Sequence, residues 1–140
     1  EVQAETDRYP NATWHGWADP NDLPLYFHAA DVIYYCLRLD YPGAIYNAPN
    51  TLSQAMSTAT PIIANNVGDL GRIVTSTHCG LLLDEVTPES ITHALTQLQD
   101  AQLRHELGQN GLKAARETYN DAHNREIITS AYQKLFNLSS

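Results

Sequence analysis

The segment Pro49-Asn50-Thr51 opens a stretch of small residues that is expected to be helical, and it offers groups that can bind an anion. The first N–H groups of a helix have no partners within the helix, and the helix dipole gives that end a partial positive charge. A diphosphate can accept hydrogen bonds from these groups, and the side chains of Asn50 and Thr51 are short enough to reach the same oxygens. The alternative is that Asn50 only caps the helix, within an ordinary crossover of an α/β sheet.

The histidines do not have the spacing of a metal site. His28, His93 and His105 fall on expected helices with polar neighbours. His15 could contact a ligand, although a histidine on a strand more often has a structural role. We therefore expect no metal, and the residue pattern by itself identifies no catalytic group.

Short apolar runs alternate with helical patterns up to about residue 85, which predicts a parallel α/β sheet. The run at 31–36 is rich in β-branched and aromatic residues, the composition of a strand buried on both faces. The expected elements are the tail of a helix at 2–8, a short strand within 12–17 that stops at Gly16, a helix capped by Asp19 with Pro20 at its first position, a strand at 31–36, a turn-rich loop at 37–48, a helix at about 50–59, a strand at 61–65, a turn at Gly68, a helix at about 69–76, and a strand at 80–83.

The rest of the chain is expected to be helical. Thr87-Pro88 has the pattern of a capped helix start, and a shorter second helix is expected to end at Gly108 or Gly111. The last helix is expected at about 119–136. The first of these helices carries the apolar residues Ile91, Leu95 and Leu98, and the second carries Leu103 and Leu107. The last has Ile128, Ala131, Tyr132 and Leu135 on one face.

Composition limits the class of partner and the compartment. The chain has 140 residues, about one domain, and a formal net charge of −8, which argues against nucleic acid or an anionic membrane as the main partner. No apolar run approaches the ~20 residues that span a bilayer. Cys36 and Cys79 each lie beside an apolar run without a CxxC pair, which predicts two reduced, buried thiols and favours a cytoplasmic location.

Four segments, in this order, resemble the C-terminal half of a GT-B glycosyltransferase of the large retaining family 4 group. They are HGW with DLPLYFHAADVIYYC, PNTLSQAMSTATPIIA, NVGDLGRIV, and CGLLLDEVTPESITHALTQL. The resemblance covers roughly residues 14 to 135. It implies a Rossmann-like parallel sheet with flanking helices, and one partial nucleotide-sugar (donor) binding domain over residues 1–140. Asp69 stands where many members have glycine, and we expect it at most to cap the helix that follows.

The resemblance also implies roles for individual residues of this sequence. The implied donor contacts are Pro49, Asn50, Thr51, Leu52 and Gln54 for the diphosphate and ribose, Gly43, Ala44 and Tyr46 for the sugar, and Gly16 and Trp17 for the base. The family often has glutamates at the positions that match Tyr46 and Gln54. Gln54 can still bond a ribose diol, but without the charge that makes such bonds about twice as strong. Trp17 could stack on the base, or Trp14 and Trp17 could simply pack.

The resemblance further implies that parts of the family's molecule are missing ahead of Glu1, namely the first strands of the domain and the N-terminal acceptor domain. In the usual strand order 3-2-1-4-5-6, a gap of two strands would separate the strand within 12–17 from that at 31–36. Either the remaining strands lie elsewhere or the sheet closes up, and both arrangements leave strand edges that favour self-association of the fragment. Because the basic pair that neutralises the leaving diphosphate is also absent, we expect no transfer by this chain alone.

The leading hypothesis is the donor-binding domain of a retaining hexosyltransferase. In the intact protein, a UDP- or GDP-linked sugar would pass to a sugar, lipid-linked or small-molecule acceptor without a metal or other cofactor, in the cytoplasm or at a membrane surface. The alternative is a non-catalytic, degenerate glycosyltransferase-like module for assembly or regulation, which the loss of both acids favours. A sugar-nucleotide epimerase on the same fold is a third hypothesis with fewer matching motifs.

Overall fold

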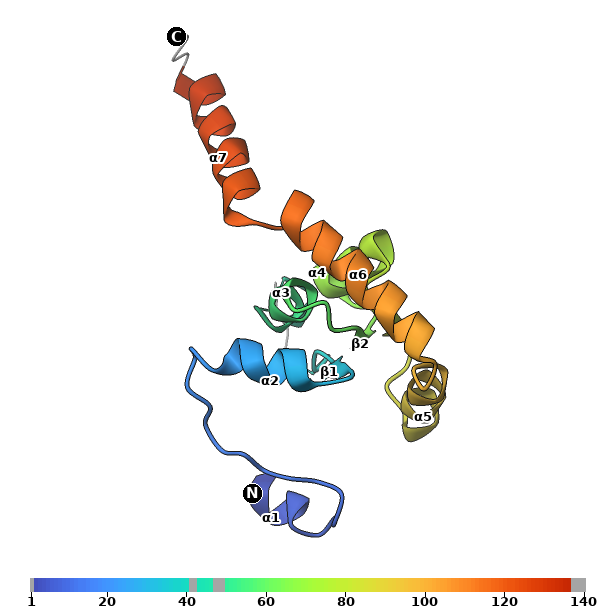
Figure 1. Ribbon diagram of the computed structural model, residues 1–140. Helices are drawn as coiled ribbons and strands as arrows, with labels where there is room; N and C mark the ends of the chain where they lie inside the picture. Colours follow the sequence, from blue (N-terminus) through green and yellow to red (C-terminus); the bar gives the residue numbers. More distant parts are fainter. Residues whose placement is uncertain (1, 41–42, 47–49, 137–140) are drawn as a thin grey trace.

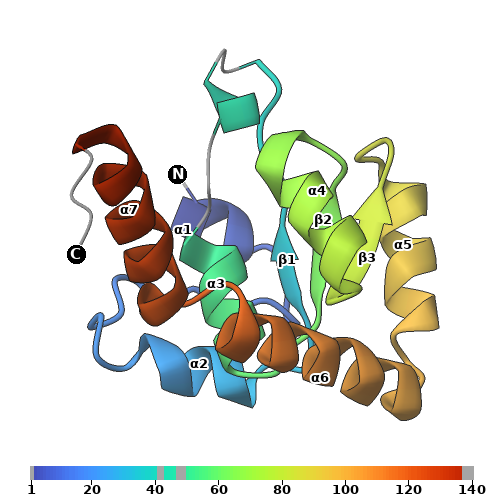
Figure 2. The same ribbon diagram turned by 90° about the horizontal axis from the view of Figure 1, so that it is seen from above.

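The computed structural model describes residues 2–40, 43–46 and 50–136, in which helices flank three parallel strands (Figures 1 and 2). The elements are α1 (Val2–Thr6), α2 (Leu23–Ala29), β1 (Ile33–Tyr35), the 3-10 helix η1 (Ala44–Tyr46), α3 (Asn50–Ser57), β2 (Ile62–Asn65), α4 (Gly68–Thr77), β3 (Gly80–Leu83), α5 (Pro88–Gln97), α6 (Ala101–Glu117) and α7 (Asp121–Phe136). The predicted α/β class with a parallel sheet is confirmed.

The sheet has the order β1-β2-β3. Ile33 pairs with Ile62 and Tyr35 with Ala64, and the β2–β3 ladder runs from the Ile62–Gly80 pair to Asn65 opposite Leu83. Because all three strands run in parallel, their carboxyl ends meet at one edge, the upper end of the strands in Figure 2.

The two faces of the sheet bury separate apolar clusters, because successive side chains of a strand point to opposite faces. On β2, Ile62 and Ala64 join the cluster under α3 and α4, whereas Ile63 joins the cluster under α5. All four residues of β2 are buried, which explains why its apolar run is so readily recognised.

Helix α6 crosses α3 closely because it carries glycines at the contact. A Cβ built on Gly108 would lie less than 3.0 Å from the carbonyl oxygen of Ala59, and one on Gly111 would lie 3.1 Å from the Cβ of Cys79. The helix therefore continues through both glycines, and the prediction that it ends at one of them is wrong. Tertiary contact outweighs the low helix propensity of glycine here.

The segment 12–17 is not a strand, contrary to the prediction. It is irregular and exposed, and the three described strands form one sheet without it. A strand of a few residues is stable only beside a hydrogen-bonded neighbour, and Figure 1 shows α1 and the segment after it lying away from the sheet. The predicted gap between this segment and β1 therefore does not occur within the sheet.

The predicted start of α2 is also wrong. The helix begins at Leu23 with Asp22 at the N-cap and Pro24 in its first turn. Asp19 instead accepts hydrogen bonds from the backbone and side-chain nitrogens of Asn21, at 2.8 and 2.9 Å. Local side-chain bonding thus forms a turn where the sequence pattern suggested a cap.

Two predictions of burial are wrong. Tyr34 on β1 is 49% exposed, because α5, which covers this face of the sheet, packs on β3 and leaves the β1 end of the face open. Cys36 is only partly buried, whereas Cys79 is buried as expected, and both thiols are free.

The predicted cap at Thr87 and the predicted last helix can both be compared with the structure. Thr87 accepts from the backbone of Ser90 and completes a capping box, as predicted. Helix α7 begins at Asp121, close to the expected start, but none of its residues is buried, and Figure 1 shows it projecting from the end of α6. No described helix is long and apolar enough to cross a membrane.

Candidate functional site

A hollow of about 560 Å³ lies at the carboxyl edge of the sheet, the place where open α/β sheets bind ligands. Its described walls come from the segments that follow β1, β2 and β3. The lining residues are Cys36, Leu37, Arg38, Leu39, Asp40, Asn65, Val67, Asp84, Glu85 and Val86. We refer to this hollow as the strand-end hollow.

The floor of the strand-end hollow contains a buried amide. Asn65, the last residue of β2, is 2% exposed. Its Oδ1 accepts from the backbone N–H of Leu37 at 2.8 Å, and its Nδ2 donates to the carbonyl oxygen of Leu37 at 2.9 Å. Both halves of the amide are therefore satisfied, and the segment that follows β1 is bonded to the end of β2.

The turn after β2 forms a second contact with the same segment. Gly68 has a φ of +52°, and a Cβ built there would lie less than 3.0 Å from the backbone of Ile45 in η1. Only glycine fits this approach without displacing the neighbouring backbone. The structure thereby brings η1, which holds the predicted sugar-contacting residues Ala44 and Tyr46, against the N-terminus of α4.

The charges around the strand-end hollow are mainly negative. The guanidinium of Arg38 pairs with the carboxylate of Asp40, and Asp84 and Glu85 follow β3 on the other side. Carboxylates accept hydrogen bonds from hydroxyl groups but repel a diphosphate. The walls alone therefore favour a neutral, hydroxyl-rich group.

The predicted diphosphate residues lie at the start of α3. Asn50 is exposed and is the first helical residue, Thr51 is partly buried, and Leu52 belongs to the core, so that only its backbone could meet a ligand. Pro49 lies outside the described residues. None of the described residues at 50–54 lines the strand-end hollow.

Gln54 lies in a different hollow of about 560 Å³, between α3 and the α6–α7 corner. Ser53 and Ser57 share its α3 wall, and Arg116 and Tyr119 stand on the α6 side. The structure therefore does not bring Gln54 to the strand-end hollow. The side chain of Tyr46 is exposed on η1 and lines neither of the two hollows.

Gly16 and Trp17 lie in the irregular segment before α2. Gly16 has a φ of +72° with open space around it, and Trp17 is fully exposed. The neighbouring His15 packs its ring against Tyr26, with centroids 5.9 Å apart. These residues do not meet the other predicted donor contacts in the described part of the chain.

Asp69 is not a cap. Val67 stands at the N-cap of α4 without a side-chain bond, and Asp69 accepts from Nε of Arg72 at 2.8 Å one turn later.

The residues at 2–40, 43–46 and 50–136 contain no group of three or more side chains suited to a metal.

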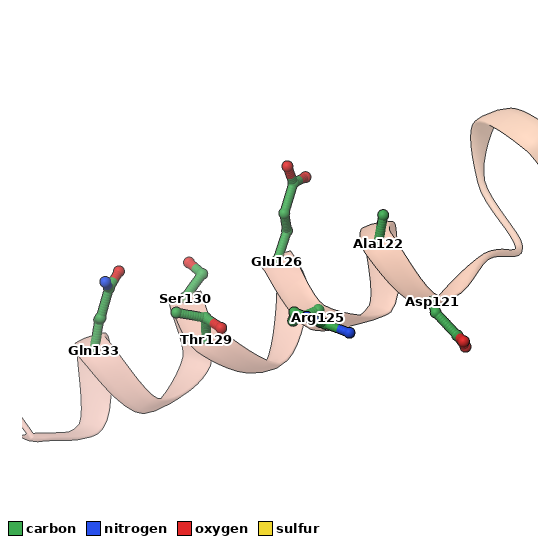
Figure 3. A pocket seen from close by; sticks show the side chains of 7 residues that line it. All are labelled: Asp121, Ala122, Arg125, Glu126, Thr129, Ser130 and Gln133. Atoms are coloured by element: carbon green, nitrogen blue, oxygen red, sulfur yellow. The ribbon is translucent and has the colours of Figure 1, made fainter.

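A further hollow, shown in Figure 3, lies along α7. All seven residues that line it, from Asp121 to Gln133, belong to this one helix, and their side chains point in several directions from it. A surface without an opposite wall cannot enclose a ligand, so we do not consider it a site.

Sequence reasoning missed the residues that line the strand-end hollow. A usable signal was present, because Asn65 ends an apolar run and Arg38, Asp40, Asp84 and Glu85 each follow one closely. The rule that ligands bind at the carboxyl ends of parallel strands would have selected them.

Comparison with known proteins gives one family match. Residues 1–101 match the family model described as glycosyl transferases group 1. Over 74 residues, which are 53% of this chain and 19% of the relative, the sequence is 30% identical to an uncharacterized 41.2 kDa protein in the cps region of Klebsiella pneumoniae.

Two solved structures share the fold. Sucrose-phosphate synthase from Thermosynechococcus elongatus matches with a TM-score of 0.78 and 25% identity, over 99% of this chain and 33% of that one. WaaG, a glycosyltransferase involved in lipopolysaccharide biosynthesis, matches with a TM-score of 0.60 and 19% identity, over 78% of this chain and 28% of that one. The chain thus spans about a third or less of the length of these proteins, and its arrangement of helices and parallel strands is that of the GT-B glycosyltransferases.

Proposed function

The chain belongs to the family described as glycosyl transferases group 1, and from this premise we propose that it is the donor-binding part of a retaining glycosyltransferase. The observation that carries the proposal is the family match over residues 1–101, which includes all three strands and the turns that line the strand-end hollow. The proposed reaction, in the intact protein, transfers a hexosyl group from a nucleotide-sugar to an acceptor with retention.

The finer assignments follow from the ordered motifs of the sequence. The proposed group is the family 4-like branch of the GT-B enzymes, the proposed donor is UDP- or GDP-linked, and the acceptor is a sugar, a lipid-linked molecule or a small molecule bound by another domain. The free thiols of Cys36 and Cys79 support a cytoplasmic location, because such thiols persist where disulfides are reduced.

Backbone N–H groups at two helix starts would bind the diphosphate. Helix α3 begins at Asn50 without an acidic residue in its first turn, and α4 begins at Gly68, against which the backbone of Ile45 packs. Amides aimed at a leaving diphosphate stabilise the charge that develops on it, and they need no reorganisation during the reaction.

The sugar and ribose contacts would come from η1 and α3. Gly43, Ala44 and Tyr46 lie in or beside η1, whose backbone rests on Gly68. Gln54, on the second turn of α3, would bond the ribose hydroxyls through its neutral amide. The base contact of Gly16 and Trp17 requires further chain beside the irregular segment that carries them.

Calorimetric titration of the full-length protein tests this function. We expect UDP or GDP, and the corresponding UDP- or GDP-linked sugar, to bind with sub-millimolar affinity. Gln54→Ala should weaken that binding by about five- to tenfold, the value of one net hydrogen bond. Ser53→Ala, which changes the neighbouring residue of the same hollow, should alter it by less than about twofold.

Two outcomes would contradict the proposal. Absence of binding by UDP, GDP and ADP at millimolar concentration would exclude a donor site. Formation of the inverted product anomer, observed by NMR in a transfer assay, would exclude retention.

A non-catalytic module is the second candidate, and a specific observation favours it. Asp40, Asp84 and Glu85 surround the strand-end hollow, and Arg38 is already paired. These carboxylates repel the diphosphate of a donor, and Gln54 and Tyr46 stand in place of the family's acids. Nucleotide binding without transfer to any acceptor would support this candidate.

A further inference from the structure

The side chain of Asn65 makes both of its hydrogen bonds to a single distant residue. Asn65 and Leu37 are 28 positions apart, and the two bonds join one amide to the N–H and the carbonyl of the same residue. Leaving a buried amide without partners is destabilising, so the folded state favours this pairing of the two segments.

The amide takes the place of a strand neighbour. The β1–β2 ladder ends where Tyr35 pairs with Ala64, yet Leu37, two residues later, is still buried. Its N–H and carbonyl groups need partners, because buried backbone groups are almost always bonded. Asn65 supplies both partners from its side chain, so β1 leaves the sheet at a defined point and in a defined direction.

The segment that follows is attached at its other end to the same turn. Leu37 is bonded to Asn65, and Ile45 rests on Gly68, three residues further along. Gly43, Ala44 and Tyr46 lie between or beside these two attachments. The turn at 65–68 therefore contacts both described parts of the segment proposed to contact the donor sugar, residues 37–40 and 43–46.

We propose that Asn65 is a positioning residue for the glycosyl part of the donor, acting through the peptide groups of Leu37. This inference rests on the proposed function. Asn65 itself touches no reacting atom; its amide places residues 38–40 at the carboxyl ends of the strands. Its loss should weaken the binding of a nucleotide-sugar more than that of the corresponding nucleoside diphosphate.

The variant Asn65→Asp gives a readout that a loss of folding would not produce. A carboxylate at residue 65 accepts from the Leu37 N–H but faces the Leu37 carbonyl as a second acceptor. The protonated acid can donate to that carbonyl and restore both bonds, and burial favours the protonated form. The effect of this variant should therefore diminish as the pH falls.

Other titratable groups share the hollow. They are Cys36 and Asp40 on the segment after β1, with the cation Arg38, and Asp84 and Glu85 after β3. Ligand binding by the wild-type protein is measured at the same two pH values, and the change between them gives the contribution of these groups, which is subtracted from that of the variant. Asn66→Asp, the same change at the next, exposed residue, adds an equal charge without reaching Leu37.

The experiment uses the full-length protein with UDP-glucose against UDP, and GDP-mannose against GDP, at pH 8 and pH 5.5. At pH 8, Asn65→Asp should weaken nucleotide-sugar binding by about tenfold, with less than about a twofold change for the nucleoside diphosphate. At pH 5.5 the loss should fall below about threefold. Asn66→Asp should match the wild type at both pH values. Asn65→Ser, which cannot bridge both groups, should weaken nucleotide-sugar binding equally at both pH values.

Equal losses for the sugar-linked and sugar-free ligands, or the same loss in Asn66→Asp, would overturn the inference.

Hydrogen exchange of the Leu37 amide is a second measurement that needs no ligand. In Asn65→Asp at pH 8 this amide should lose at least about tenfold protection, while Ile63 in β2 remains protected. If the wild type binds none of the four compounds, the proposed function fails, and unchanged Leu37 protection would separately show that Asn65 does not hold the segment. If Asn65→Asp does not fold at pH 8, Asn65→Ser decides the outcome.

Discussion

At the scale of single residues, the thiol of Cys36 lies on the wall of the strand-end hollow, whereas that of Cys79 lies in the core. Cys79 is 2% exposed, and burial raises its pKa. Thiol reactivity requires access and the thiolate form, so the two cysteines should differ sharply in reactivity.

We expect one fast and one slow thiol when the native protein is treated with a small disulfide reagent. The slow thiol should react at least about 100-fold more slowly, because it is reached only after local opening. Cys36→Ser should remove the fast phase, and Cys79→Ser should leave it unchanged. Similar rates for both thiols would contradict the assigned burial.

Tyr34 and Cys36 lie on the same face of the chain, two residues apart. The hydrogen bond with the Cys36 side chain, followed by partial burial and the charge of that thiolate, raises the pKa of Tyr34 to about 12. Because the folded-state pKa lies above the ordinary value of 10.0, the resulting stability is complete below pH 10.0 and is lost as the pH rises towards about 12.

Ultraviolet difference titration of the wild type against Tyr34→Phe isolates this group among the tyrosines. The Tyr34 phenol should ionise near pH 12 in the native protein, and Cys36→Ala should lower its pKa towards 10.0. Cys79→Ala is the control and should have no effect. Ionisation of Tyr34 at its ordinary pKa in the wild type would show that the bond to Cys36 does not form.

At the scale of elements, α6 and the end of α3 meet at glycines. An alanine would ordinarily stabilise a helix by about 1 kcal/mol relative to glycine. At Gly108, however, the added Cβ would collide with the backbone at Ala59, which cannot rotate away as a side chain can. The collision should therefore outweigh the gain in helix propensity.

We expect Gly108→Ala to destabilise the protein by about 1–3 kcal/mol in denaturant unfolding, the usual cost of overpacking. Gln109→Ala, at the next and exposed position of α6, should change stability by less than about 0.5 kcal/mol. A stabilising effect of Gly108→Ala would mean that α6 does not approach Ala59 this closely.

At the scale of the whole molecule, α7 contributes little to the packed core. None of its residues is buried, and its apolar residues Ile127, Ile128, Tyr132, Leu135 and Phe136 are exposed. An isolated helix of this length is marginal in water without packing. Strand β1 is an edge strand of the described sheet, and the strand-edge association expected from the sequence stays a prediction.

Removal of α7 by truncation after Asn120 should leave the thermal midpoint of residues 1–120 within about 2 °C of that of residues 1–140, because the deletion removes no buried contact. Truncation after Ala101, which removes α6 and with it Leu107 and Gly111, should abolish cooperative unfolding. A large loss of stability on removing α7 alone would mean that its apolar face is covered within the molecule. Calorimetry of the three polypeptides measures both effects.

Local patterns in the sequence were enough to predict the central elements. The apolar runs at 62–65 and 80–83 are strands because they are flanked by turn residues and lie between helices, and Thr87 with Ser90 caps α5 through bonds within four residues. The ordered motifs also led to the GT-B glycosyltransferase fold and to a glycosyl transferase family, whereas the family 4-like branch and retention stay predictions. All of these features depend on residues close together in the chain.

Other features depend on segments that are distant in the sequence, and only the tertiary structure decided them. The run at 12–17 looks like a strand but has no described neighbour to pair with. Gly108 and Gly111 look like helix ends but allow two helices to touch. The sequence by itself determined the α/β class and the motif order, because propensity and periodicity are local. The strand-end hollow, and the bond from Asn65 to Leu37 that shapes it, were decided by tertiary structure, because the pairing of groups 28 residues apart leaves no local pattern.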